Sequence, residues 1–428
     1  MIFSLDVRRA RKGDCLLLHF GTRDKPGLVM IDGGPKSVYQ PFLRPRLLKI
    51  KEARKLGAQQ PLPVDLLMVS HVDDDHIQGI LDLTRELRAA QNQAPLARVL
   101  GLWHNSFDDI IGNTPAELTA SVSAQFGAAS LGGGLPPEAR IDLGAGASQA
   151  KQEIADATLS VLASIDQGFR LRGDAEALGW QRNPEFGGKL VLAGKTRRPV
   201  GAGLSFTVAG PMLPEVKALQ KMHDQWLKGR KKKTDAAALA AYVDQSVPNL
   251  SSIVVLAESG AKRMLLTGDA RGDKILKGLE AAGLMKKGGK IRVDVLKVPH
   301  HGSSNNLDDD FFARIAAEHY VFSGNGEHGN PERESMEMLF EARGKDPFHI
   351  HLTYPVAEID LGRKADWEQE QAKEKARKGK KKPRPDWSAP KQSLAAFFKA
   401  HKLAKGQHID IVDEHAPHVI DLLDPLQY

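Results

Sequence analysis

A cluster of metal-ligand side chains stands between an apolar strand pattern and a helical pattern near the start of the chain. Residues 65–70 (DLLMVS) have the apolar run typical of a buried strand, and residues 77–83 (IQGILDL) have helical spacing. The loop between them holds four such side chains within six positions: His71, Asp73, Asp75 and His76. Polar residues between a strand and the following helix lie at the mouth of an α/β sheet, where such proteins usually place their chemistry. Imidazole and carboxylate groups together predict a site for a divalent cation.

Helix capping is the simpler alternative for this loop. Asp74 or Asp75 could cap the helix that starts at Ile77. Capping needs a single aspartate, however, and it explains neither of the two histidines. We therefore favour a metal site.

Two later segments repeat the order of strand, polar turn and ligand. Residues 265–270 (LLTGDA) end an apolar run with Asp269, and residues 296–303 (LKVPHHGS) end another with His300 and His301. Each segment alone could be an ordinary turn or a polar loop. Together with the first loop, they predict ligands that converge on one edge of a sheet.

The composition is that of an ordinary soluble globular protein. Of the 428 residues, 41% are hydrophobic and 26% are charged, and Lys and Arg exceed Asp and Glu by 60 to 53. The net charge of +7 favours an acidic substrate over a basic one. The single cysteine, Cys15, excludes an internal disulfide and a cysteine-rich zinc site. We expect a reducing, cytoplasmic location and no membrane partner, because no signal peptide or membrane-spanning run is visible.

With these motifs the chain resembles the metallo-β-lactamase superfamily, and its ComEC-like hydrolase branch in particular. That branch has a GD pair near the start, an SHxDxDHxxG loop, a TGD turn and a KVxHHGS turn. The matching residues here are Gly13-Asp14, Ser70 to Gly79, Thr267 to Asp269, and Lys297 to Ser303. SGN at 323–325 and HGNP at 328–331 are similar to the closing segment of the branch. The likeness covers residues 1 to about 110 and 249 to about 355.

The resemblance implies an α/β fold of a specific kind, the four-layer αββα sandwich with two mixed sheets face to face and helices outside. It implies a hydrolase domain over residues 1–360, with a middle insertion at about 108–248. We expect residues 361–386 to form a charged flexible segment and residues 387–428 to form a small C-terminal appendage.

The resemblance also assigns the ligands of two divalent cations. One cation would bind His71, Asp73 and His104, the other Asp75, His76 and His301, with Asp269 bridging them. Asn105 is an alternative to His104 as the polar group of the site. Asp14 and Asp32 would orient the histidines through their second ring nitrogens.

Asp73 stands where the HxHxDH motif of the superfamily has its second histidine. An oxygen ligand makes the site harder and shifts its preference toward Mn²⁺ or Mg²⁺ relative to Zn²⁺. We expect two divalent ions, Zn²⁺ or Mn²⁺, with Mg²⁺ as a further option. The same change weakens the case for an antibiotic-degrading β-lactamase.

The implied reaction is hydrolysis with two metal ions, in which Asp75, Asp269 and His300 take part directly. Two cations about 3.5–4 Å apart lower the pKa of water and stabilise the attacking and leaving oxygens. His301 directly precedes a glycine, as the last ligand of the family does, which leaves His300 to protonate the leaving group.

The substrate that we expect is nucleic acid, so the chain would be a nuclease or phosphodiesterase acting on DNA or RNA. Two basic runs could bind the phosphate backbone without reading sequence: Lys228, Arg230, Lys231, Lys232 and Lys233, and Lys380, Lys381 and Lys382. Either run could equally be a solvated charged surface. Two alternatives stay open, namely a hydrolase of a cyclic nucleotide, phosphoester or thioester, and a regulatory metal-binding protein without turnover.

Residues 363–386 hold ten basic and five acidic residues, which favours a solvated helix or a disordered loop over a core element. We expect preferential cleavage there by trypsin-like proteases, and a role as a tether for nucleic acid, as a lid, or only as a linker. A protease or a regulatory protein is therefore a candidate partner. Residues 408–412 and 418–422 are expected to pair with each other as two strands.

Overall fold

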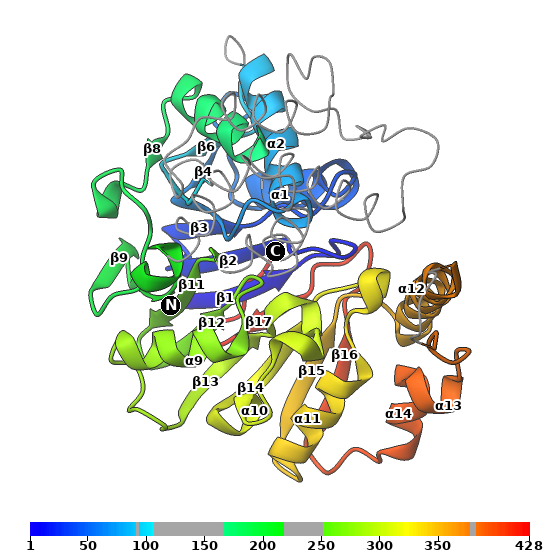
Figure 1. Ribbon diagram of the computed structural model, residues 1–428. Coiled ribbons are helices and arrows are strands. Elements are labelled where there is room, and N and C mark those ends of the chain that lie inside the picture. The colour runs from blue at the N-terminus through cyan, green and yellow to red at the C-terminus, as the bar shows by residue number, and fades with distance from the viewer. Residues whose placement is uncertain (91–93, 107–165, 218–250, 377–381) are drawn as a thin grey trace, which may run out of the picture.

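Two large β-sheets pack face to face and form the body of the protein (Figure 1). The computed structural model describes residues 1–90, 94–106, 166–217, 251–376 and 382–428. A small third sheet pairs β4 (Leu62–Val64) in parallel with β6 (Ala97–Val99).

The first sheet is antiparallel in one half and parallel in the other. Its described strands lie in the order β17 (Val419–Asp421), β1 (Ile2–Val7), β2 (Leu16–Gly21), β3 (Pro26–Ile31), β5 (Leu66–Val69), β7 (Gly101–His104) and β8 (Gln181–Arg182). Strands β1, β2 and β3 form a meander of antiparallel neighbours. Strands β3, β5, β7 and β8 run parallel, so their carboxyl ends meet at one edge of the sheet.

The second sheet has the same mixed character. Its described strands lie in the order β16 (Gln407–Ile411), β15 (Phe348–Leu352), β14 (Ile315–Phe322), β13 (Ile291–Lys297), β12 (Lys262–Leu266), β11 (Val254–Ser259), β10 (Leu204–Gly210) and β9 (Arg197–Gly201). From β12 to β16 the strands are parallel, and from β9 to β12 they are antiparallel.

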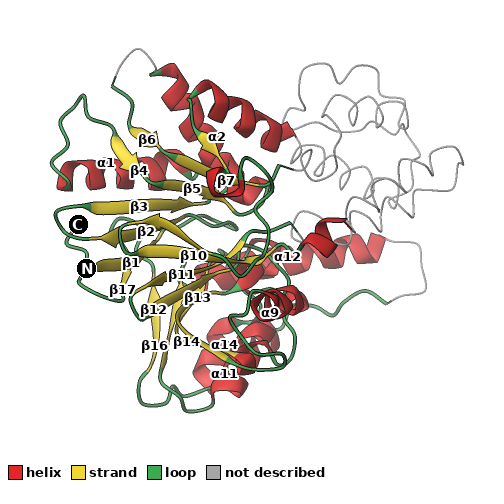
Figure 2. Ribbon diagram, turned by 90° about the vertical axis from the view of Figure 1, so that its left-hand side faces the viewer, coloured by secondary structure: helices red, strands yellow, loops and turns green. Residues whose placement is uncertain are grey.

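Helices cover the outer faces of both sheets, as Figure 2 shows. On the side of the first sheet lie α1 (Arg44–Ala53) and α2 (Asp74–Ala89). On the side of the second sheet lie α9 (Gly272–Ala281), α10 (Phe311–Arg314), α11 (Arg333–Arg343) and α14 (Leu394–Ala400). Two further helices are α12 (Val356–Ala376) and α13 (Ala389–Gln392).

Apolar side chains alternate between the two faces of each sheet and so build separate cores. In β2, Leu16 and Leu18 face the second sheet, whereas Leu17 packs with the side chains of α1 and α2. In β12, Leu266 faces the first sheet and Leu265 packs with α9 and α11. This period of two is the expected pattern of strands that are covered on both sides. The α/β class predicted from the sequence is confirmed.

The C-terminal residues differ from the appendage that we expected. Strands β16 and β17 do not pair with each other, because β16 adds to β15 in the second sheet and β17 adds to β1 in the first. Leu394 and Phe397 of α14 belong to the core under the second sheet. Residues 387–428 are therefore built into both sheets and complete one edge of each.

The middle of the chain also contributes to the sheets. Part of the expected insertion at 108–248 is described, and it supplies β8 to the first sheet and β9 and β10 to the second. Residues 107–165 and 218–250 lie outside the described part.

The charged segment begins as a helix. Helix α12 runs through Ala376, which agrees with one of the two forms that we expected for 363–386. Arg363 and Gln371 are buried, and Arg363 donates to the carbonyl of Gln392 over 2.6 Å. Across the described residues, no helix is both long enough and apolar enough to cross a membrane.

Candidate metal centre

The loop after β5 continues directly into α2. Asp73 is the N-cap residue and has extended backbone angles, yet its side chain makes no capping hydrogen bond. Asp74 is exposed and accepts hydrogen bonds from Gln78 (2.8 Å) and Gln167 (3.1 Å). Capping therefore does not account for the aspartates of this loop.

A close backbone contact holds α2 against the loop that follows β3. A Cβ atom at Gly79 would lie 1.9 Å from the carbonyl oxygen of Gly33, so only glycine fits at this position. The amide of Gly33 donates to the carbonyl of His76 over 2.7 Å. These contacts hold the first turn of α2 against the loop that follows β3, which brings Asp32 next to His76.

The turn after β12 approaches the loop after β5 equally closely. Gly268 has a φ of +51°, and a Cβ atom there would lie 2.9 Å from Cβ of Ser70. Because the turn can come this near, Asp269 reaches His71 and His76, which follow β5 of the other sheet.

The turn after β13 has an unusual backbone. His300, His301 and Gly302 have φ values of +47°, +54° and +84°. A left-handed conformation costs about 1–2 kcal/mol for each non-glycine residue. The turn buries His301 and leaves the His300 side chain 26% exposed.

Asp269 is the centre of the resulting cluster. Its carboxylate lies 3.3 Å from Nε2 of His76, 3.2 Å from Nε2 of His301 and 4.0 Å from Nε2 of His71. Among the described residues, four groups of three here have ligand atoms within 4.8 Å of one another. Two of them contain Asp14, with Asp32 and His76 or with Asp269 and His301, and the other two are His71, His76 and Asp269, and Asp75, His76 and His301. Asp75 lies 3.8 Å from Nε2 of His301.

The donor atoms of this cluster fit a metal ion. Among the described residues, four of its buried atoms have no hydrogen-bond partner: Nε2 of His71, His76 and His301, and Oδ1 of Asp269. Buried polar atoms are rarely left unpaired in proteins unless an ion or water completes them. Imidazole nitrogens with carboxylate oxygens form a mixed donor set that suits Zn²⁺ and Mn²⁺.

Asp73 and His104 stand at the margin of the cluster. Oδ2 of Asp73 lies 3.5 Å from Nε2 of His71. His104 is buried at the end of β7, opposite Val69 in the register, but belongs to none of these groups of three. Asn105, the alternative to His104, does not serve as the polar group of the site. Its side-chain amide forms two hydrogen bonds with the backbone of Val191, of 2.9 and 2.8 Å.

Asp32 orients His76. One Asp32 oxygen lies 2.8 Å from Nδ1 of His76, and the carboxylate accepts two hydrogen bonds of 2.7 Å from the amide and hydroxyl of Ser70. A histidine whose Nδ1 is bound in this way presents Nε2 to a metal ion.

Asp14 holds the opposite side of the cluster. It lies 3.5 Å from Nδ1 of His301, accepts a hydrogen bond from the hydroxyl of Ser323, and pairs with Lys297. Ser323 also lies 3.1 Å from Nδ1 of His301. Asp14 and Ser323 together therefore set the orientation of His301.

Three residues of the site were not singled out from the sequence: Ser70, Lys297 and Ser323. Each belongs to a motif quoted above, SHxDxDHxxG, KVxHHGS or SGN. The motif letters were thus a signal that could have identified them, but their roles depend on contacts between distant parts of the chain.

The electrostatics favour positive charge inside the cluster. Burial would raise the pKa of Asp269, but the imidazoles of His301 and His76 outweigh it and hold that pKa well below its usual value. Burial would lower the pKa of His76, yet the carboxylates of Asp269 and Asp32 hold it well above its usual value. The pKa of His301 is raised against burial, chiefly by Asp269. In the metal-free protein, protons on these histidines take the place of cationic charge.

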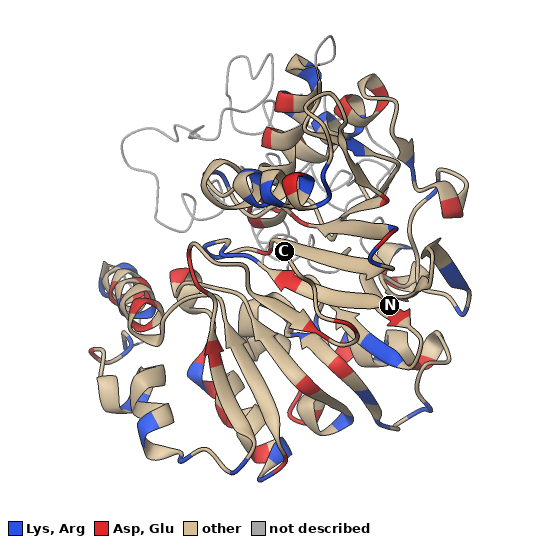
Figure 3. Cartoon of the chain, turned by 180° about the vertical axis from the view of Figure 1, so that it is seen from behind, with Lys and Arg blue, Asp and Glu red and all other residues tan. Residues whose placement is uncertain are grey.

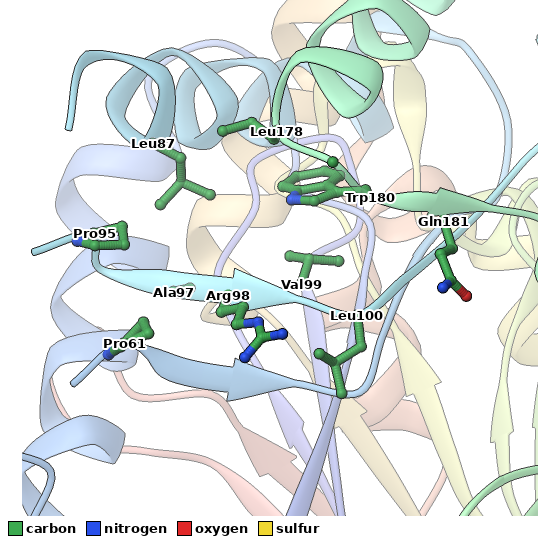
Figure 4. A pocket seen from close by; sticks show the side chains of 11 residues that line it. Pro61, Leu87, Pro95, Ala97, Arg98, Val99, Leu100, Leu178, Trp180 and Gln181 are labelled. Carbon is green, nitrogen blue, oxygen red and sulfur yellow. The ribbon is translucent and has the colours of Figure 1, made fainter. Parts of the chain in front are cut away.

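A separate pocket of about 510 Å³ lies away from this cluster (Figure 4). Its lining includes Leu87, Val99, Leu178 and Trp180. Leu87 follows His76 by eleven residues along α2, which is about 16 Å of helix. The pocket is therefore distinct from the metal cluster.

The predicted basic runs are described only in small part. Lys228 to Lys233 and Lys380 to Lys381 lie outside the described residues, whereas Lys382 is described and exposed. Figure 3 shows Lys and Arg interspersed with Asp and Glu on the face that it draws.

Comparisons with known proteins add little to this geometry. No family model matches the chain. Microtubule-associated protein 1A of Rattus norvegicus is 34% identical over 85 residues, which are 18% of this chain and 3% of that protein. The protein futsch of Drosophila melanogaster is 41% identical over 58 residues, 14% of this chain and 1% of that protein. The chain thus spans only a few per cent of the curated relatives that it matches.

One similar solved structure is a candidate metal-dependent hydrolase from Parabacteroides distasonis. It covers 82% of this chain and 98% of its own, with 8% identity and a TM-score of 0.30. A likeness at this level carries no argument about the site.

Proposed function

We propose that this protein is a metal-dependent hydrolase with the four-layer fold and two-cation chemistry of the metallo-β-lactamase superfamily. One observation carries the proposal: four buried donor atoms, on His71, His76, His301 and Asp269, converge without hydrogen-bond partners among the described residues. In the metal-free protein, Nε2 of His76 and of His301 face the Asp269 carboxylate at 3.3 and 3.2 Å, so a fold that brings these atoms together from three separate turns is suited to a cation. Two sheets enclosed by helices on both outer faces support the same fold assignment.

The ligands divide into two sets that meet at Asp269. His71 and Asp73 would hold one cation, Asp75, His76 and His301 the other, and Asp269 lies near enough to both sets to bridge them. Divalent ions bound there would supply Lewis-acid chemistry and lower the pKa of water. The partly exposed side chains of Asp73 (27%) and Asp75 (19%) mark the open side, from which a substrate would approach.

His300 lies at this open side and is the residue that would move a proton. Its Nε2 is 4.0 Å from Oδ2 of Asp269. Burial lowers its pKa below the usual value, so the ring is neutral at neutral pH. It would therefore accept a proton before it could donate one to a leaving group, which refines the acid role inferred from the sequence.

The substrate class that we propose is a phosphodiester, with DNA or RNA as the first candidates. Three observations support it: the carboxylate-rich ligand set suits Mn²⁺ and Mg²⁺ as well as Zn²⁺, the net charge is +7, and the motifs resemble the ComEC-like branch. A cyclic nucleotide would satisfy the same ligand set.

The proposal can be tested with the purified chain. It is incubated with Mn²⁺, Zn²⁺ or Mg²⁺, and hydrolysis of plasmid DNA, RNA and cyclic dinucleotides is measured. Degradation of DNA or RNA is the expected result. Cleavage of cyclic dinucleotides alone would make the chain a small-molecule hydrolase, and stoichiometric metal without any turnover would make it a binding protein. Asp269→Ala and His76→Ala are each expected to abolish hydrolysis, and normal turnover in either would contradict the two-cation mechanism.

Neighbouring aspartates provide a matched pair for the metal assignment. Asp73→Ala should lower the bound metal, because Asp73 lies 3.5 Å from Nε2 of His71. Asp74→Ala should not, because Asp74 is exposed and bound to Gln78 and Gln167. The reverse result would show that the wrong aspartate has been assigned as the ligand.

A further inference from the structure

A second group of histidines lies on the second sheet and shares no residue with the metal centre. The ligand atoms of His319 on β14 and of His349 and His351 on β15 all lie within 4.8 Å of one another. His408 on β16 and His418, just before β17, are their neighbours. We call the first three residues the histidine triad.

The strand register explains why the triad gathers on one face. His319 is opposite His349 across the β14–β15 pair, and His349 is opposite His408 across β15–β16. Ile350 and Leu352, which alternate with the histidines in β15, pack in the core under the helices. The histidines therefore lie on the other face of the sheet, toward the side where the first sheet packs.

The spacing of the ring nitrogens is close to that of ligands around one ion. Nδ1 of His319 lies 3.0 Å from Nε2 of His351. The other nitrogen of His351, Nδ1, lies 2.8 Å from Nε2 of His418, so His418 orients His351 from outside the triad. Nitrogens bound at 2.0–2.1 Å to a tetrahedral Zn²⁺ are about 3.4 Å apart. A shift of a few tenths of an ångström would allow these rings to coordinate an ion.

A carboxylate orients one member of the triad. Oδ2 of Asp410 on β16 lies 2.8 Å from Nδ1 of His349. In metal sites, a carboxylate that binds one ring nitrogen fixes the tautomer and leaves the other nitrogen as the ligand. Asp410 would orient His349 through Nδ1, in the way that Asp32 contacts Nδ1 of His76.

Burial favours the neutral form of His319, His351 and His418. Burial, followed by the neighbouring histidine His418, holds the pKa of His351 well below its usual value. Burial also lowers the pKa values of His319 and His418. Neutral imidazoles keep a lone pair for a metal ion.

We propose that His319, His349 and His351 form a second metal site, which binds a borderline divalent ion such as Zn²⁺ through three imidazoles and leaves its fourth position to water. Imidazole donors suit Zn²⁺, Cu²⁺ and Ni²⁺, and they discriminate against Mg²⁺ and Mn²⁺. Because His418 directly precedes β17 of the first sheet and lies 2.8 Å from Nδ1 of His351, an ion on the triad would be coupled to the first sheet through His418. Its role would be to stabilise the fold, independently of whether the metal centre turns over a substrate.

The rival reading is a relay of hydrogen bonds, in which each neutral ring donates to the next. Both readings predict that loss of His351 destabilises the protein. They differ in whether Zn²⁺ matters, and in whether the site discriminates between metals.

The experiment counts metal ions bound by the full chain, prepared without an affinity tag. Zn²⁺ and Mn²⁺ are titrated by calorimetry into the wild type, His349→Ala and His351→Ala, with His415→Ala, an exposed histidine, as the matched control. We expect His349→Ala and His351→Ala to bind one Zn²⁺ fewer than the wild type and the control, with Mn²⁺ binding unchanged. Because His349 is 35% exposed, its variant should fold even if that of His351 does not.

A second measurement separates this site from the metal centre. In an Asp269→Asn background, Zn²⁺ should still raise the unfolding temperature, and Co²⁺ should give the intense visible absorption of a tetrahedral site. Both effects should disappear when His349→Ala is added. Equal Zn²⁺ binding in the wild type and a folded His349→Ala variant, or an unfolding temperature that does not respond to Zn²⁺ in the Asp269→Asn background, would overturn the proposal in favour of the hydrogen-bond relay.

Discussion

The ammonium nitrogen of Lys297 lies 2.5 Å from a carboxylate oxygen of Asp14, and both side chains are almost entirely buried. The same nitrogen lies 3.6 Å from Asp269 and donates to the carbonyl of Gly268 over 3.1 Å. Lys297 ends β13, so it joins the loop before β2 to the turn after β12. Burial would lower its pKa, but Asp14 and Asp269 outweigh burial and raise it, so the lysine stays charged. It supplies positive charge among the carboxylates of the metal centre.

Replacing this lysine should therefore destabilise the protein strongly. Lys297→Met keeps most of the side-chain volume but leaves the buried carboxylate of Asp14 without its cation. Breaking a buried ion pair on one side costs about 3–5 kcal/mol. Chemical denaturation of the metal-free protein measures the change in unfolding free energy. Lys286→Met, at an exposed lysine, is the control and should change it by less than about 0.5 kcal/mol. Equal stability of the two variants would show that Lys297 is not the compensating charge.

The contact between Asp32 and His76 predicts a change in metal affinity without loss of a ligand. Asp32 has a φ of +57°, a conformation that asparagine also tolerates. Asp32→Asn should keep the fold but weaken the hold on Nδ1 of His76, which lowers metal affinity by about 10–100-fold. Asp82 is a partly exposed aspartate on α2, the helix that carries His76, and Asp82→Asn should leave the metal affinity unchanged. The metal dissociation constants of the wild type and the variants are measured by competition with a chelator. Identical constants for the wild type and Asp32→Asn would show that Asp32 does not orient His76 for metal binding.

Metal affinity should fall as the pH falls. Histidine ligands must be neutral to bind, and in the metal-free protein the pKa of His76 is well above 6.5 and that of His301 is raised. Below these raised pKa values both rings carry protons that an incoming ion must displace. The affinity should therefore drop by up to about tenfold per pH unit for each displaced proton. Calorimetry in buffers of different ionisation enthalpy counts the released protons, and an affinity that is constant between about pH 6 and 8 would contradict this account.

The parts of the site that were predictable from the sequence are those whose ligands stand in short local motifs after apolar strands. The HVDDDH loop, Asp269 and His301 are of this kind, and the structure brings them together. The contact between Ser323 and Asp14 joins residues 309 positions apart, so no local pattern could reveal it. The roles of these residues as ligands stay predictions until metal is measured.

The pairing of the edge strands of the two sheets was also hard to predict, because it joins residues that are far apart in the sequence. Residues 408–412 and 418–422 have strand patterns, and their short separation favoured pairing with each other. In the structure each adds to a strand far away in the sequence, β15 and β1 respectively. Side-chain alternation predicts that a strand exists and which face is buried, but the edge that it joins depends on which sheet lacks a neighbour. No strand was predicted for residues 181–210, although they supply β8, β9 and β10.

Cys15 offers a reporter for the stability predicted for Lys297→Met, because it is the one cysteine of the chain. It is 1% exposed, just before β2, and burial raises the pKa of its thiol to about 12. At pH 8 only about one molecule in 10,000 would carry the reactive thiolate, even where a reagent could reach it. We therefore expect the folded protein to resist alkylation by iodoacetamide and the unfolded protein to react as an ordinary thiol. Lys297→Met should be labelled faster than the wild type in proportion to its lower stability, and Lys286→Met should not. Rapid labelling of the folded wild type would mean that the loop before β2 opens locally, in which case Cys15 would not report on global unfolding.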